Sequence, residues 1–380
     1  MPTLDGWRAI AILAVMGYHA QDFHLFGHSI TLLHNYGSQG VDLFFAISGF
    51  LICSRLLHED NDTGKINLGD FYLRRAFRIL PPVLVFLSLI AVLGSLHVIP
   101  ITLMGWLSSL LFFRNYYSAV AGFDSFYTLH FWTLSVEEHF YLLLPAVLIV
   151  CRNFRRLALG CLIVFFLIWQ RIFLTGFPQR TDLHINALLL PALLAVLLFS
   201  GQVRLWFVRW MAPSVALVFF AVCALLEHRF GGDASVAYGL KPIFKLAFAL
   251  VIISTVLHPQ AILSRFLELS WLRWIGRLSY SLYVWQQLFF CDKRIIQPQE
   301  FAVGPLRIFQ SSALSMFAVF AVATASYYWV ERPAIQFGRR LLTKLATLRT
   351  DPKFITAKPM GEPPQRSTAI PDSAFPLEVN

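Results

Sequence analysis

Charged residues are scarce in this chain. Only 14% of its 380 residues are Asp, Glu, Lys or Arg, whereas soluble globular domains average about 25%. Hydrophobic residues make up 57%, with 36 phenylalanines and 10 tryptophans, and the mean hydropathy is +0.63. No polar stretch is long enough to fold separately. The composition excludes an ordinary soluble domain and predicts a polytopic membrane protein with one folded domain.

Cysteine is rare and lacks a pattern. Cys53, Cys151, Cys161, Cys223 and Cys291 lie in or at the ends of apolar runs, without CxxC or CxxH spacing. A disulfide framework or a zinc site is recognised by such spacing, so we expect neither, and we expect no metal. A cleavable signal peptide is not expected either, because no basic stretch precedes the first apolar run.

The basic residues far outnumber the acidic ones but are not gathered in one patch. The formal net charge is +10, yet the basic residues are scattered between apolar runs, where they set membrane topology. We therefore expect membrane lipid as a partner, and no nucleic acid.

Ten apolar runs predict an all-α fold of about ten transmembrane helices. The predicted spans are 4–23, 38–57, 80–98, 134–151, 157–174, 183–199, 213–228, 242–257, 274–292 and 307–330. An eleventh run, 101–113, is short, and we expect it to be re-entrant or interfacial.

With ten crossings, the basic residues gather on one side of the membrane, which is the cytoplasmic side by the positive-inside rule. Both termini then lie in the cytoplasm. Residues 1–335 form the transmembrane domain. Residues 336–380 form a cytoplasmic tail, largely disordered after about 350 because it is rich in proline and polar residues.

The first span carries an arginine and a histidine on one face. Arg8 and His19 are eleven residues apart, which returns to nearly the same side of a helix about 16 Å along its axis. Ionisable groups inside a span usually face a cavity or a partner. The structural alternative is that Arg8 extends to the membrane surface and His19 marks the end of the helix.

Acidic residues occur in two other spans. Asp42 stands near the start of the second span and needs a cationic or hydrogen-bonding partner there. Ser48 and Gly49 follow in mid-span, where Gly49 predicts close helix packing. In SVEE, Ser135 and Glu138 have the spacing of a capping box, which leaves Glu137 free to face inward.

A basic segment precedes the third span. Arg75 and Arg78 are three residues apart and so share a helical face, and Pro81 and Pro82 are expected to open the span. This segment predicts either an amphipathic helix on anionic lipid or a clamp for phosphates that arrive from the cytoplasm.

Five ordered blocks within about residues 1–335 resemble the membrane-bound acyltransferase 3 family. They are LDGWRA…YH, GVDLFFAISGFLI, FYLRRAFRILPP, FWTLSVEEHFYLLLP, and LSYSLYVWQQ with a terminal ERP. The family's arginine–histidine pair matches Arg8 and His19, its RxxR motif matches Arg75 and Arg78, and its two acidic residues match Asp42 and Glu137. Gln286 departs from the family, because many members have histidine there, and His139 replaces the more usual Gln or Trp.

The family O-acylates sugars of lipopolysaccharide, exopolysaccharide, Nod factors and some antibiotics. The resemblance implies transfer from cytoplasmic acyl-CoA, most commonly acetyl-CoA, to a hydroxyl of a saccharide or glycolipid. His19 would be the general base or an acyl relay, and Asp42 or Glu137 would orient it. Arg8 would stabilise the oxyanion or bind a phosphate, and Arg75 and Arg78 would hold CoA phosphates. A homo-oligomer and a glycan-assembly partner both remain open.

Two other classes of function remain open. A transporter or flippase also combines many spans with buried ionisable groups, although no internal repeat relates the two halves of this chain. A structural scaffold would not explain ionisable residues on several separate spans.

Overall fold

The computed structural model describes residues 1–19, 24–25, 28–29, 37, 39–121, 126–173, 179–230, 234–290 and 312–350. These residues are helical apart from turns, short connections and one antiparallel ribbon, in which β1 (His24–Leu25) pairs with β2 (His28–Ser29). The predicted all-α class is confirmed.

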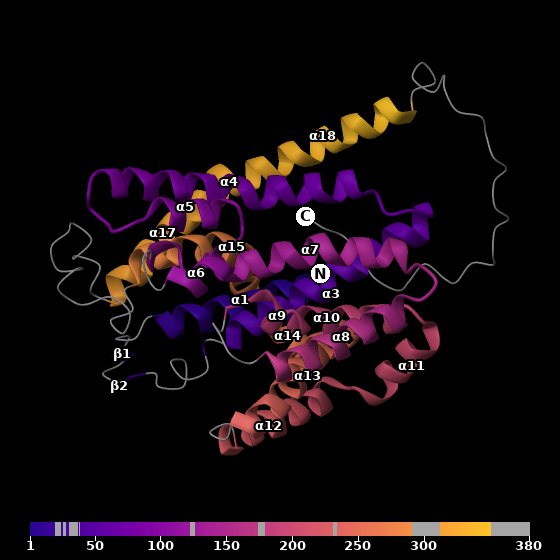
Figure 1. The fold of residues 1–380 in the computed structure, drawn as a ribbon. Coiled ribbons are helices and arrows are strands. Elements are labelled where there is room, and N and C mark those ends of the chain that lie inside the picture. The colour runs from indigo at the N-terminus through magenta and orange to yellow at the C-terminus, as the bar shows by residue number, and fades with distance from the viewer. Residues whose placement is uncertain are drawn as a thin grey trace.

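The helices follow one another with short connections (Figure 1). Their bounds are α1 Pro2–His19, α3 Gln39–Thr63, α4 Leu68–Ser95, α5 Leu103–Leu110, α6 Arg114–Ala121, η1 Phe126–Thr128, α7 Phe131–Val150, α8 Arg155–Ile172, α9 Thr181–His184, α10 Asn186–Leu198, α11 Gly201–Trp210, α12 Pro213–Phe230, α13 Ala234–Leu257, α14 Ile262–Leu267, α15 Ser270–Phe289, α17 Ser312–Ser326, the π-helix η3 Tyr327–Glu331, and α18 Arg332–Thr350.

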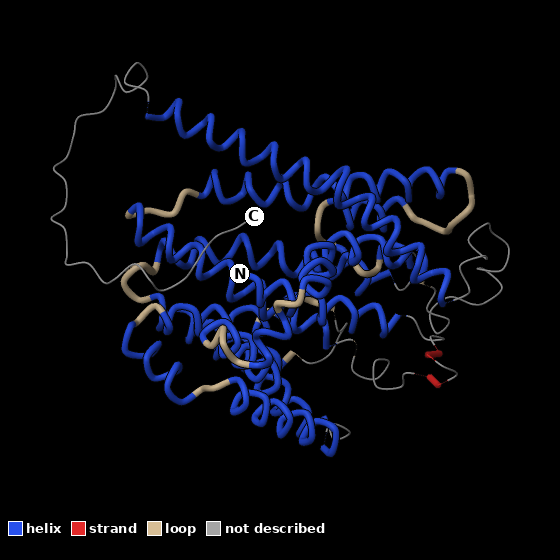
Figure 2. Tube along the Cα trace, turned by 180° about the vertical axis from the view of Figure 1, so that it is seen from behind, coloured by secondary structure: helices blue, strands red, loops and turns tan. Residues whose placement is uncertain are grey.

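The long helices lie side by side around α1, which packs between α3 and α15. Helix α18 lies along α4 at one edge of the bundle, and α12 pairs with α13 at the opposite edge (Figure 1). Figure 2 shows the same order from behind, with the β1–β2 ribbon apart from the helices. Helices α1 and α15 therefore meet at the centre, although most of the chain separates them.

Glycines allow the closest approaches at this centre. A Cβ atom at Gly276 of α15 would collide with the backbone of Asp5 in α1, and one at Gly49 of α3 would collide with the backbone of Leu188 in α10. The expectation that Gly49 marks close helix packing is confirmed.

Many large apolar side chains of the described helices point outward. Examples are Val150 on α7, Phe165 on α8, Leu225 on α12 and Phe317 on α17. An exposed apolar surface of this extent is typical of an integral membrane protein, whose outer face meets lipid tails.

Each predicted span coincides with a helix in its described part, but the count of about ten crossings is not confirmed. By length and composition, the described residues hold six helices able to cross a membrane, or seven if α10 and α11, bent by 108°, form one span. Run 101–113 contains α5, whose eight residues pack on α4 and α7; a crossing needs about 20.

Two predicted helix starts are wrong. Helix α4 begins at Leu68, so Pro81 and Pro82 lie in its interior and do not open it. Helix α7 begins at Phe131, and the Ser135 hydroxyl donates to the Phe131 carbonyl (3.0 Å). Ser135 therefore caps nothing, and no capping box holds Glu138. The predicted disordered segment after 350 lies outside the described residues.

Candidate active site

A partly open cavity lies among α1, α3, α4, α7 and α15. Four of the predicted site residues line it: Arg8, Arg75, Arg78 and Glu137. Hydroxyl-bearing side chains complete the polar part of its wall, and these are Ser48, Thr133, Tyr141, Ser279, Tyr280 and Tyr283. We call this cavity the arginine pocket.

Glu137 is held by a hydroxyl from another helix. Ser48 of α3 donates to its Oε1 (2.7 Å). Beside it, the Arg75 guanidinium lies 3.5 Å from the centre of the Tyr141 ring, and the charges of Glu137 and Glu138 act on it. A cation over an aromatic face is attracted by the ring quadrupole. This wall is therefore polar and preorganised, with the Glu137 carboxylate and the Arg75 cation at fixed positions.

Three arginines and one carboxylate line the arginine pocket. Arg8 forms a long ion pair with Asp5 (3.7 Å) on its own helix, and its strongest neighbouring charge is that of Arg78. Glu331 is buried and accepts from the Ser281 hydroxyl (2.7 Å), and the charges of Arg78 and Arg8 act on it. Within the described ranges, neither Arg75 nor Arg78 forms an ion pair within 4 Å. An arrangement of this kind suits an anion such as phosphate.

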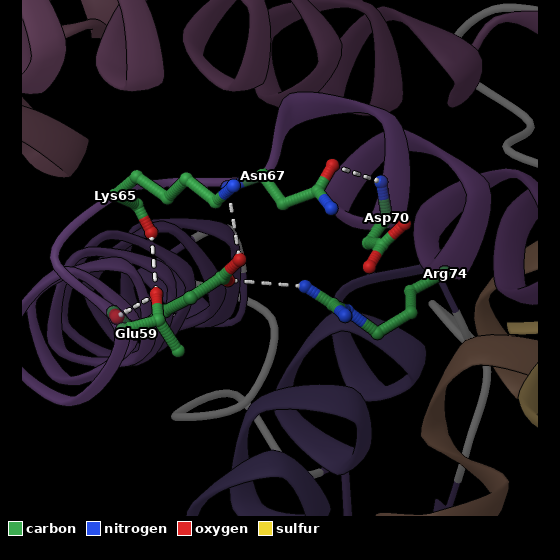
Figure 3. Close-up of polar contacts among 6 residues, drawn as sticks. Glu59, Lys65, Asn67, Asp70 and Arg74 are labelled. Atoms are coloured by element: carbon green, nitrogen blue, oxygen red, sulfur yellow. Dashed lines mark hydrogen bonds and ion pairs between the residues drawn. The ribbon is translucent and has the colours of Figure 1, made fainter. Parts of the chain in front are cut away.

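A hydrogen-bonded corner fixes how α4 leaves α3 (Figure 3). Glu59 accepts from the Asn67 backbone N–H (2.9 Å) and pairs with Arg74 (3.2 Å). Asn67 caps α4 by accepting from the Asp70 N–H (3.2 Å). The corner occupies Arg74 and lies at the first turns of α4, the helix that also carries Arg75 and Arg78.

The wall of the pocket continues toward the other end of α1. The Tyr283 hydroxyl lies 2.5 Å from the Thr133 hydroxyl and donates to the His130 carbonyl (2.7 Å). The His130 ring lies 3.1 Å from the Val284 carbonyl, and the charge of His19 acts on it. His19 is not among the residues that line the pocket. The structure thus separates Arg8 from His19 along α1.

Asp42 lies on a different face of α3. Its strongest charged neighbours are Lys245 and Lys241 of α13, and its charge acts in turn on Glu227 of α12, which accepts from Gln39 (3.5 Å). We call these four ionisable residues the lysine cluster. The cluster gives Asp42 the cationic neighbours that the sequence required, but it does not place Asp42 in the arginine pocket.

Gln286, the departure from the family pattern, is fully buried on α15. Neither atom of its amide group has a hydrogen-bond partner among the described residues. A buried amide without partners costs free energy, so this side chain suits a role in contact with a ligand or a proton carrier better than a purely structural one.

Sequence reasoning missed several residues of this site. Tyr141, Tyr280 and Tyr283 were not singled out as site residues, and Arg55 and Glu331 were not linked to the arginines. The clearest available signal is helical spacing, since Tyr141 follows Glu137 by four residues and Arg55 follows Ser48 by seven.

Comparison with known proteins identifies a family. Residues 1–332 match the acyltransferase 3 family model, described as an acyltransferase domain. The chain is 30% identical over 317 residues to the putative O-acetyltransferase SAS0844 of Staphylococcus aureus (strain MSSA476), covering 75% of this chain and 50% of the relative. It is 29% identical over 370 residues to O-acetyltransferase OatA of Staphylococcus aureus (strain NCTC 8325 / PS 47), covering 89% of this chain and 58% of the relative.

The chain therefore spans about half the length of these curated relatives. No solved structure matches it. The family model covers the helices that form the arginine pocket, so the chain belongs to the acyltransferase 3 family of membrane proteins.

Proposed function

We propose that this protein is an integral membrane O-acyltransferase of the bacterial inner membrane, with both termini cytoplasmic. It moves an acyl group, most simply acetyl, from cytoplasmic acyl-CoA to a hydroxyl of a saccharide or glycolipid. The observation that carries the proposal is the arginine pocket, where Arg8, Arg75 and Arg78 from two helices meet around Glu137.

The pocket supports an acyl-CoA donor because its cations outnumber its carboxylates. Arg75 and Arg78 bind donor phosphates through their guanidinium forks. Arg8, on α1, lines the pocket with them and binds a phosphate of the donor, because about 16 Å of helix separate it from His19. Glu137, fixed by Ser48, keeps Arg75 in place.

Acyl transfer needs a base that removes the acceptor's proton, and His19 is the proposed base. Its imidazole takes the proton of the acceptor hydroxyl as the oxygen attacks the thioester carbon. The C–S bond then breaks, and the CoA sulfur leaves with the proton returned by the imidazolium. The hydrogen bonds from Thr133 to Tyr283 and from Tyr283 to His130, together with the charge of His19 that acts on His130, support a path between the donor and the acceptor.

An acyl-histidine relay at His19 is the second form of this mechanism, and it suits an acceptor on the far side of the membrane. The proposed role of Asp42 in orienting the base has less support than that of Glu137, because the lysine cluster holds Asp42 on another face of α3.

The test is mass spectrometry of surface glycans and glycolipids from cells with the intact chain, with His19→Ala, with His228→Ala, or without the chain. His228 is exposed on α12 and serves as the matched control. A hydroxyl-linked acyl mass should appear with the intact chain and the control only, since losing a general base lowers rates about 10²–10⁴-fold. No acyl difference, with all proteins in the membrane, would favour a transporter or flippase.

A further inference from the structure

One end of the arginine pocket is lined by uncharged residues. At the charged end, the Arg75 guanidinium lies 3.5 Å from the centre of the Tyr141 ring. The opposite end is formed by residues of α3, α7 and α15 that carry aromatic rings, aliphatic groups or one short hydroxyl. These residues are Val41, Phe44, Phe45, Thr133, Leu134 and Tyr283. We call this part of the pocket the aromatic end.

The two ends lie apart along the helices that form the walls. On α7, Tyr141 follows Thr133 by eight residues, which is about 12 Å of helix. On α3, Ser48, which donates to Glu137 (2.7 Å), follows Val41 by seven residues, which is about 10 Å. The pocket is therefore elongated, with Arg75 and Glu137 separated from the aromatic end by about two helical turns.

The aromatic end lies on the His19 side of Arg8. Gly40, the neighbour of Val41, packs closely on α1, where a Cβ atom at Gly40 would lie 2.9 Å from Val15 Cγ2. Val15 follows Arg8 by seven residues and precedes His19 by four. Passing along the pocket from its arginines to its aromatic end therefore leads toward the proposed base.

The polar groups of the aromatic end are already occupied. The Tyr283 hydroxyl donates to the His130 carbonyl (2.7 Å) and lies 2.5 Å from the Thr133 hydroxyl. The Phe44 ring meets the buried Tyr283 ring edge to face, with their centres 6.3 Å apart. This end consequently offers rings and aliphatic groups to a ligand. A saccharide, which needs several hydrogen bonds, fits it less well than an apolar group does.

The length of the proposed donor matches the length of the pocket. In CoA, about twelve bonds separate the pyrophosphate from the sulfur, which is about 15 Å when extended. Phosphates bound by Arg75 and Arg78 would therefore place the thioester at the aromatic end. The acyl group, which lies beyond the sulfur, then meets Phe44 and Tyr283.

We propose that the aromatic end binds the acyl group of the donor and that the ring pair of Phe44 and Tyr283 limits this group to acetyl or propionyl. The inference rests on the proposed function, because it names the acyl part of that donor. Two hydrogen bonds hold the Tyr283 hydroxyl, and the Phe44 ring rests on the Tyr283 ring. Since Tyr283 is held in place, the ring pair resists displacement by a longer chain.

The test measures binding, so it does not require the acceptor. The purified full chain in lipid nanodiscs is titrated with CoA, which has no acyl group, and with acetyl-CoA, propionyl-CoA and butyryl-CoA. The variants are Phe44→Ala, Phe44→Leu and the control Phe317→Ala. Phe317 lies on α17 with 72% of its surface exposed, so its loss removes a phenyl ring outside the pocket.

The intact protein and the control should bind butyryl-CoA at least tenfold more weakly than acetyl-CoA, because extra methylene groups in a closely packed site cost a factor of this size. Phe44→Ala should bring the two affinities within about threefold of each other, and Phe44→Leu should fall between. Binding of CoA should stay within about twofold in every variant, which shows that the fold and the phosphate site are intact.

Other results would overturn the inference. If the intact protein binds all three acyl-CoA donors equally, or binds butyryl-CoA best, the pocket sets no such limit, although the acyl-CoA proposal stands. If Phe44→Ala leaves the ratio of butyryl-CoA to acetyl-CoA affinity unchanged, or weakens CoA and every acyl-CoA equally, Phe44 supports the fold and does not meet the acyl group. If the intact protein binds neither CoA nor any acyl-CoA, the proposed donor falls together with the inference.

Discussion

Two polar clusters lie on different faces of α3, and their charges are balanced differently. On one face Ser48 holds Glu137 beside the cations of the arginine pocket. On another face Asp42 lies within the lysine cluster, where Glu227, Lys241 and Lys245 complete two acids and two bases. Two acids and two bases neutralise one another's charge. A cavity wall with three arginines and one carboxylate is instead stabilised when it binds an anion. The comparison therefore assigns binding to the first cluster and helix packing to the second.

Arg8→Gln should give the largest change in activity. Acyl transfer should fall about 10–10²-fold, the cost of removing one charged partner of a donor phosphate. The unfolding temperature should stay the same or rise, because Arg78 is the strongest charge beside Arg8. Activity is measured with labelled acyl-CoA in membranes, and unfolding in detergent. Full activity in this variant would show that the arginine pocket is not the catalytic site.

Asp42→Asn should act mainly on stability. Removing the carboxylate removes the negative charge that acts on Lys245. We expect the free energy of unfolding to fall by about 1 kcal/mol, because among the described residues no ion pair within 4 Å joins Asp42 to a lysine. Activity per folded molecule should fall less than fivefold. Glu227→Gln is the matched variant and should change stability in the same direction. If Asp42→Asn has the same unfolding temperature as the intact protein but is inactive, the catalytic role predicted from sequence is right. The assignment of Asp42 to helix packing is then wrong.

Ser48→Ala should give a smaller effect on the pocket side. It removes the 2.7 Å hydrogen bond to Glu137, and a bond to a charged acceptor contributes about 1.5–3 kcal/mol. We expect kcat to fall about tenfold or more, with little change in KM for the acceptor. Ser95→Ala, which loses only a hydroxyl contact to its own helix, should change nothing. Equal behaviour of the two serine variants would contradict a role for Glu137.

Arg74→Gln should have the smallest effect. Arg74 pairs with Glu59 at the exposed corner of Figure 3, with 47% of its side chain accessible, and such pairs contribute about 0.2–1 kcal/mol. Transfer should remain within twofold of the intact protein. A large loss of activity would mean that Arg74 binds the donor. The donor site would then extend beyond the residues that line the arginine pocket.

The sequence predicted the helices and one part of the site well. The spacing of Arg75 and Arg78 places both on one face, and both line the pocket. The sequence predicted less well which side chains from different helices lie together. Asp42 precedes Ser48 by six residues, about 240° around the helix, so the two cannot serve the same cavity equally. Pairings such as Ser281 with Glu331 depend on which helices become neighbours, and a single sequence does not encode that locally.

The two prolines inside α4 have a mechanical consequence. Neither Pro81 nor Pro82 has an N–H, so the carbonyls of Phe77 and Arg78 lose their usual helical donors, and the helix is less stiff at this turn. The Tyr280 hydroxyl braces the same turn by donating to the Ile79 carbonyl (2.8 Å), and Tyr280 also lines the arginine pocket. A ligand that takes this hydroxyl removes the brace. Occupancy of the pocket and the bending rigidity of α4 are therefore coupled. Arg75 and Arg78 precede the two prolines, so bending of α4 at this turn would move both arginines.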